Sequence, residues 1–295
     1  MTKREQLKIE LIRKIHGFVG TVDVEKTRHS QQQLGTLLGN SRELEYKEVT
    51  VGDINAEWIC VKKPHDEKRV ILYCHGGGYS TGSRKYSRTV TSKLALYTFM
   101  DVFSFDYRLA PEYPYPAALE DAVEVWNHLM LMGYGADDII VAGDSAGGNL
   151  ALALVFKLKE EGRRLPKGLV LLSPWTDMTH SGQSITKRAE LDPVLDVAYL
   201  HKMRDSYVGG QDLENPYISP LFGGFDNFPP TYIQVGENEI LYSDSVRLYK
   251  RMLEANSLVK IDKFEGMCHV FQMLPTKKAQ EAIEKIAKFI FEICR

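Results

Sequence analysis

From residue 70 onward, short apolar runs alternate with longer segments that have a helical pattern. The apolar runs cover residues 70–74, 102–105, 139–142, 169–172, 232–235 and 260–264. The helical segments lie near residues 86–97, 118–132, 146–161, 243–255 and 276–293. Continuous apolar runs joined by helices are typical of a mostly parallel sheet that is covered on both faces. The alternation therefore predicts an α/β fold.

Residues 44–61 precede this alternation and predict a β-hairpin. Two strand-like segments flank Gly52 and Asp53, a residue pair that favours a tight turn. With the six apolar runs, the hairpin brings the expected sheet to eight strands. Further upstream, apolar residues recur at helical spacing among charged ones and predict an amphipathic helix: Leu7, Leu11, Ile15 and Phe18.

One connection in the chain is much longer than the others. Residues 176–226 contain three prolines and several aromatic residues, and they show no clear strand. A connection of this length is usually functional or an inserted subdomain. We expect an insertion at the carboxyl end of a strand, on the side where open α/β sheets bind their ligands.

Composition limits which binding partners and which cellular location we expect. The 295 residues carry 37 Lys and Arg against 39 Asp and Glu, a formal net charge of −2. This balance gives no electrostatic reason to expect nucleic acid or an anionic membrane as a partner. The N-terminal residues lack a signal-peptide pattern, and no apolar stretch approaches 18 residues. We therefore expect a cytoplasmic protein without a membrane span. The four cysteines form no C-x-x-C pair, so no zinc site is expected.

The strongest functional feature is Gly-Asp-Ser-Ala-Gly at residues 143–147. It follows an apolar run and opens a helical segment, which is the context that makes a G-x-S-x-G pattern specific. A serine on such a sharp turn needs small neighbours, and it lies at a helix N-terminus, where developing negative charge is favoured. We therefore expect Ser145 to be a catalytic nucleophile.

A second glycine-rich motif, His75-Gly76-Gly77-Gly78, follows the first apolar run of the alternation. Consecutive glycines cost backbone entropy, and a fold keeps them where a ligand must approach the main chain. Acyl transfer needs N–H donors around the oxygen that becomes negative. We expect Gly76, Gly77 and Ala146 to form this oxyanion hole and His75 to be structural. A phosphate-binding loop is disfavoured because no G-x-G-x-x-G or Gly-Lys-Ser/Thr is present.

An activated serine needs a base, and the base needs a carboxylate that orients it. In α/β hydrolases these follow the serine in the order acid, then histidine. His201 lies inside the long insertion, whereas His269 follows the last apolar run and therefore lies at the same sheet edge as Ser145. We expect His269 to be the base.

Three ordered motifs resemble those of the hormone-sensitive-lipase-like family, also called bacterial family IV or the α/β-hydrolase fold-3 group of carboxylesterases. They are residues 75–78, Tyr-Arg-Leu-Ala-Pro-Glu at 107–112, and 143–147. The resemblance spans residues 70–275. It implies one α/β-hydrolase domain whose helical cap comes from about 1–40 and 176–226. It also implies that residues 107–112 support the site, and members of the family often form homodimers through the edge strand. Acyl transfer by an activated serine requires no metal or cofactor.

The family places an aspartate in an Asp-x-Leu pattern after the next-to-last strand. Here Glu239 occupies that slot, two residues before Leu241. A glutamate can orient imidazole as an aspartate does, although its extra methylene requires a different backbone position. We expect Glu239 to be the acid, with Asp244 as the alternative and Glu237 as a weaker one.

The resemblance implies a small-molecule substrate, a carboxylic ester with a short to medium acyl chain. An amide or a lactone could be cleaved by the same residues, and relatives of this fold exist that bind small molecules without hydrolysis. A group of apolar residues in or near the insertion fits either the wall of a substrate pocket or the ordinary core: Trp175, Met178, Tyr199, Met203 and Phe222.

Overall fold

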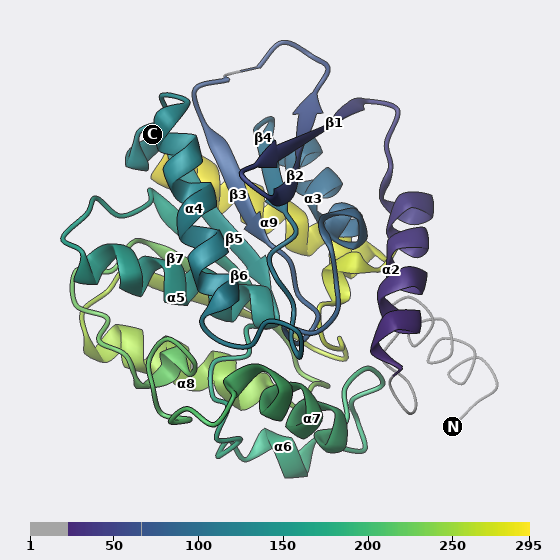
Figure 1. The fold of residues 1–295 in the computed structure, drawn as a ribbon, viewed down its shortest axis with the longest axis vertical. Helices are drawn as coiled ribbons and strands as arrows, with labels where there is room; N and C mark the ends of the chain where they lie inside the picture. The colour runs from purple at the N-terminus through teal and green to yellow at the C-terminus, as the bar shows by residue number, and fades with distance from the viewer. Residues whose placement is uncertain (1–22, 66) are drawn as a thin grey trace.

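An eight-stranded sheet crosses the middle of the protein (Figure 1). The computed structural model describes residues 23–65 and 67–295. The strands have the order β1-β2-β4-β3-β5-β6-β7-β8, and β2 runs antiparallel to both of its neighbours while the others pair in parallel. Their bounds are β1 Leu44–Val51, β2 Ile54–Val61, β3 Val70–Cys74, β4 Asp101–Phe105, β5 Ile139–Asp144, β6 Gly168–Leu172, β7 Thr231–Gly236 and β8 Val259–Phe264.

Helices cover both faces of this sheet. On one face α3 contacts β2, β4 and α9, and α9 contacts β6 and β7. On the other face α5 contacts β3, β5, β6 and α4, while α8 contacts β7 and β8. In Figure 1, α4 and α5 lie in front of the sheet and α9 lies behind it. The helices are α3 Arg84–Thr98, α4 Ala117–Leu131, α5 Ala146–Glu160, α8 Tyr242–Glu254 and α9 Lys277–Ile293.

Burial explains why the sequences of the central strands are continuous apolar runs. Every residue of β3, β5, β6 and β7 is buried, because helices pack on both sides of these strands. The edge strands β1 and β8 are instead partly exposed along their length. The predicted α/β fold, the eight strands and the hairpin turn at Gly52 are confirmed.

The insertion between β6 and β7 is helical. It contains α6 (Ser184–Lys187), α7 (Val197–Val208) and the short 3₁₀ helix η2 (Pro220–Phe222). The two α-helices lie together at the lower end of the molecule in Figure 1. At the other end of the chain, α2 (Val24–Gly39) packs against α3. The helix predicted around residues 7–18 lies outside the described residues. Across residues 23–65 and 67–295, no helix is both long and apolar enough to cross a membrane.

Candidate active site

Ser145 lies at the junction between β5 and α5. Its backbone has φ 53° and ψ −120°, which is uncommon for a residue other than glycine. The turn is tied on both sides, since the Ser145 N–H donates to Leu172 O (2.9 Å) and the Trp175 N–H donates to Ser145 O (3.0 Å). The side chain stands before the first turn of α5, with 8% of the residue exposed. The strand–turn–helix context expected for the G-x-S-x-G motif is therefore present.

His269 reaches Ser145 from the loop after β8. Its Nε2 lies 2.9 Å from Ser145 Oγ, a hydrogen-bond distance, and the imidazole is almost fully buried. When Nε2 carries no proton, it accepts the hydrogen bond from the serine hydroxyl. This is the arrangement that a general base needs before it removes the serine proton.

Glu239 stands on the opposite side of the imidazole. Its Oε1 lies 3.5 Å from His269 Nδ1, and its Oε2 accepts from Ser173 Oγ (2.8 Å) and from the Gly236 N–H (3.1 Å). A separation of 3.5 Å is longer than an ordinary hydrogen bond, but catalytic hydrogen bonds often shorten only when substrate is bound. The structure therefore places the side chains in the order serine, histidine, glutamate.

The other candidates for base and acid lie elsewhere. Asp244 Oδ2 accepts from the N–H groups of Thr176 (2.8 Å) and Asp177 (2.9 Å), so its carboxyl fastens the segment after β6. Burial raises the pKa of Asp244 to about 8. His201 is exposed on α7, where its ring stacks on His180 at 5.0 Å.

The glycine motif differs from expectation at Gly76. We expected its N–H to be an oxyanion donor, but it donates to Asp144 Oδ1 (3.0 Å) and is therefore already paired. Gly77 adopts φ +124°, a conformation that only glycine reaches easily. Within the part of the chain that the structure describes, the N–H groups of Gly77, Gly78 and Ala146 have no hydrogen-bond acceptor. These three are therefore available as donors to an oxyanion.

Asp144 and His75 anchor this motif to the serine turn. Asp144 Oδ1 accepts from Tyr73 Oη (2.7 Å) as well as from Gly76, and burial raises the pKa of Asp144 to about 6. The His75 ring stacks on Tyr107 at 4.1 Å, and the Tyr107 hydroxyl donates to His75 O (2.8 Å). Burial lowers the pKa of His75, which favours the neutral ring in this structural position.

The family model described as alpha/beta hydrolase fold matches residues 71–273. An acetyl-hydrolase from Streptomyces hygroscopicus is 37% identical over 246 residues, covering 82% of this chain and 81% of that protein. An esterase from Acinetobacter venetianus is 34% identical, with 87% and 85% covered. Among solved structures, a hormone-sensitive lipase from a metagenome library superposes with a TM-score of 0.92 at 34% identity, covering 100% of this chain and 99% of that one.

The chain belongs to the hormone-sensitive-lipase-like family of α/β hydrolases. Its esterase relatives, which are matched over most of their length, identify it as a carboxylic ester hydrolase. The resemblance carried by residues 75–78, 107–112 and 143–147 is thus confirmed at the level of the family.

Two residues that hold Glu239 and its neighbour in place were not predicted from the sequence. Ser173 donates to Glu239, and its Oγ also accepts from the Val270 N–H (3.2 Å), next to His269. Asp192 accepts from the Ile240 N–H (2.9 Å), next to Glu239. Asp192 lies in a Leu-Asp-Pro segment similar to one that recurs in the family, but nothing in the sequence pairs it with residue 240.

The predicted pocket residues of the hydrolase are mostly buried, and two of them adjoin the glycine motif. A Cβ added to Gly78 would lie 2.9 Å from Met203 Cγ and 3.3 Å from Tyr199 Oη. Helix α7 therefore packs directly over the motif. Trp175 also lies close to the serine, because its N–H donates to Ser145 O.

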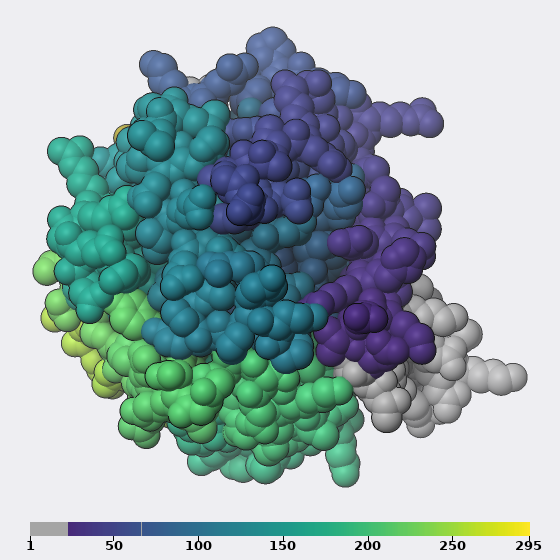
Figure 2. Space-filling view, in the orientation of Figure 1, coloured from purple at the N-terminus to yellow at the C-terminus, as the bar shows by residue number. Residues whose placement is uncertain are grey.

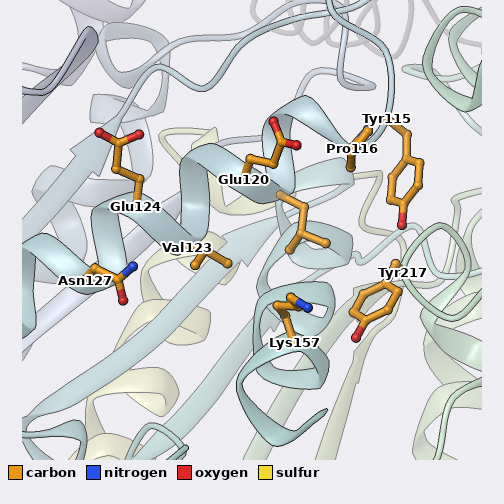
Figure 3. A pocket seen from close by; sticks show the side chains of 9 residues that line it. Tyr115, Pro116, Glu120, Val123, Glu124, Asn127, Lys157 and Tyr217 are labelled. Carbon is orange, nitrogen blue, oxygen red and sulfur yellow. The ribbon is translucent and has the colours of Figure 1, made fainter. Parts of the chain in front are cut away.

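A separate groove of about 470 Å³ lies between α4, α5 and the end of the insertion (Figure 3). Lys157, in its wall, is twelve residues beyond Ser145, roughly 18 Å along the helix. Lys157 Nζ pairs with Glu160 (3.0 Å), and Tyr217 Oη donates to the same carboxylate (2.7 Å). The groove is lined by Tyr115, Pro116, Leu119, Glu120, Val123, Glu124, Asn127, Lys157 and Tyr217. It is distinct from the serine site, and we assign it no chemistry.

Proposed function

We propose that this hydrolase cleaves carboxylic esters with short to medium acyl chains through an acyl-enzyme on Ser145. The observation that carries the proposal is the contact of 2.9 Å between His269 Nε2 and Ser145 Oγ, with Glu239 on the other side of the ring. A hydroxyl, a base and an orienting carboxylate in this order form the arrangement that activates serine for attack on a carbonyl.

In the first half of the reaction, His269 Nε2 takes the proton of Ser145 as Oγ attacks the ester carbonyl. The imidazolium that forms is stabilised by the Glu239 carboxylate at Nδ1. His269 then gives the proton to the leaving alcohol, and the acyl group remains on Ser145. In the second half, His269 takes a proton from water, which attacks the acyl-enzyme and releases the acid.

Negative charge develops on the carbonyl oxygen in both halves. We assign its stabilisation to the N–H groups of Gly77, Gly78 and Ala146, because the Gly76 N–H is already used by Asp144. Ala146 is the first residue of α5, so the helix N-terminus also favours the charge. Losing one such donor typically lowers the rate by about 100- to 1,000-fold.

The acyl-chain preference belongs to the same proposal. The Streptomyces relative is named an acetyl-hydrolase, which supports a short acyl group. We further propose that α2 and residues 176–226 form a cap over the site, since α7 packs against Gly78 and α2 against α3. Such a cap would cover the glycine motif and so bound the space that is open to the acyl chain.

A panel of p-nitrophenyl esters with two to twelve acyl carbons, together with one amide and one lactone, tests this proposal. We expect the highest kcat/KM on the short to medium esters. The Ser145→Ala variant should fold normally and lose turnover on all of them, because no other group forms the acyl-enzyme. Turnover by the variant at a rate near wild type contradicts the mechanism. A higher kcat/KM on the amide or the lactone would show that the enzyme prefers that substrate class to simple esters.

A further inference from the structure

Helix α2 contacts the oxyanion loop, which we define as residues 76–82, through two side chains. Arg28 Nε donates to Ser80 O (2.8 Å), and Gln31 Oε1 accepts from the Gly82 N–H (2.8 Å). Gln31 is buried. Figure 2 shows α2, in purple, lying against the blue part of the chain. The helix therefore binds one acceptor and one donor of the loop backbone.

Arg28 also binds a second loop, residues 107–112. Arg28 Nη2 donates to Ala110 O (2.9 Å), and the guanidinium forms a two-pronged ion pair with the Glu112 carboxylate at 2.8 Å on each oxygen. Hydrogen bonding to Arg28 lowers the pKa of Glu112 to about 2, so the pair stays ionised at neutral pH. The Ala110 N–H in turn donates to Tyr79 O (2.8 Å). Arg28 thus bridges two loops that also bond to each other.

The loop residues that contact α2, Ser80 and Gly82, lie close to the loop residues nearest the serine, Gly76 and Gly77. Gly77 O accepts from the N–H groups of Ser80 (3.2 Å) and Thr81 (2.9 Å), which closes a tight turn. A Cβ added to Gly82 would lie 2.0 Å from Gly76 O, so the two arms of the loop touch. A displacement at Ser80 or Gly82 is therefore transmitted to Gly76 and Gly77.

We infer that Arg28 is a positioning residue for ester hydrolysis, and that it acts on the transition state by fixing the oxyanion loop. The inference rests on the proposed function of Ser145. Oxyanion donors are effective because they are oriented before the charge develops, and a misplacement of about 1 Å can cost roughly 100-fold in rate. Helix α2 therefore contributes to the chemical step from outside the site.

The test compares Arg28→Met with wild type, using p-nitrophenyl butyrate as substrate and phenylboronic acid as inhibitor. The boronate forms a tetrahedral adduct on serine, so its affinity reports on the oxyanion donors. We expect Arg28→Met to lower kcat by about 10- to 100-fold with KM within about threefold, and to weaken the boronate by a similar factor. Lys26→Met is the matched control, because Lys26 lies on the same helix with an exposed side chain, and within residues 23–65 and 67–295 its one ion pair is with Asp23 (3.1 Å). The control should stay within about twofold of wild type.

Exhaustive labelling with a fluorophosphonate counts the folded active sites of each variant by mass spectrometry. A loss of kcat that exceeds any loss of labelled sites supports the inference. An unchanged kcat, a change in KM alone, or a loss equal to the missing sites overturns it. If wild type itself hydrolyses no ester, the proposed function fails instead, and the two failures are distinct.

A further variant separates the carbonyl contacts from the ion pair. Glu112→Gln removes the charge of the carboxylate but leaves Arg28 bound to Ser80 O and Ala110 O. We expect kcat of Glu112→Gln to remain within about threefold of wild type, because the two carbonyl contacts through which Arg28 fixes the loops are kept. A loss as large as that of Arg28→Met would assign the effect to the ion pair and overturn positioning through the loop carbonyls.

Discussion

At the scale of single residues, Glu239 occupies a position where the family pattern places an aspartate. Its Oε2 is held by Ser173 Oγ and the Gly236 N–H, which leaves Oε1 facing His269 Nδ1. The longer side chain thus reaches the imidazole from a fixed position. In the proposed mechanism this carboxylate orients the ring so that Nδ1 carries the proton and Nε2 is free to accept one.

Glu239→Gln is expected to lower kcat by about 1,000- to 10,000-fold while the protein stays folded. The glutamine oxygen would accept from Ser173 and Gly236, which turns the NH₂ group toward His269 Nδ1. The imidazole would then carry its proton on Nε2 and could not accept one from Ser145. Steady-state kinetics with p-nitrophenyl butyrate measure the effect.

Asp244→Asn is the matched control for the acid. The asparagine oxygen still accepts from the N–H groups of Thr176 and Asp177, so we expect kcat within about threefold of wild type. The reverse result, with Asp244→Asn nearly inactive and Glu239→Gln active, would move the acid to residue 244.

We expect the buried carboxyl of Asp192 to make the free energy of unfolding depend on pH. Burial raises the pKa of Asp192 in the folded state to about 6, from an ordinary value of 3.8. Between these values the folded protein binds more protons than the unfolded chain, so this carboxyl lowers the free energy of unfolding as pH rises from about 4 to 6. The Asp192→Asn variant lacks this contribution, so it serves as the reference. The stability difference is the free energy of unfolding of wild type minus that of Asp192→Asn. We expect this difference to fall by up to about 3 kcal/mol between pH 4 and 6 and to stay level at higher pH. Urea denaturation at several pH values measures it, and a difference that is constant or rises with pH would contradict the burial effect.

At the scale of elements, the docking of α2 depends on a close approach to α3. A Cβ added to Gly35 would lie 2.1 Å from Lys85 O, which is a backbone atom and can move only if a helix moves. We therefore expect Gly35→Val to lower the free energy of unfolding by about 1–3 kcal/mol. Thr36→Val, at an exposed position of the same helix, is the control and should change it by less than about 0.5 kcal/mol. Equal effects of the two changes in urea denaturation would refute the close contact.

At the scale of the whole molecule, the sheet could be predicted because it is buried on both faces. The predicted runs at 70–74 and 139–142 agree with β3 and β5 to within two residues. The strand-to-helix turn at Ser145 and the loop position of His269 followed from chain order. The pairing of Gly76 with Asp144 did not, since it depends on contacts between residues 68 positions apart. The same holds for Arg28 and Glu112, which only the tertiary fold brings together.

Fluorophosphonate labelling and residual esterase activity, followed on the same sample, test most directly whether Ser145 is the nucleophile. We predict one label per chain, located on Ser145 by peptide mass spectrometry, with activity falling in proportion to the labelled fraction. Activity that survives complete labelling of Ser145, or inactivation by a label on another residue, would show that Ser145 is not the nucleophile.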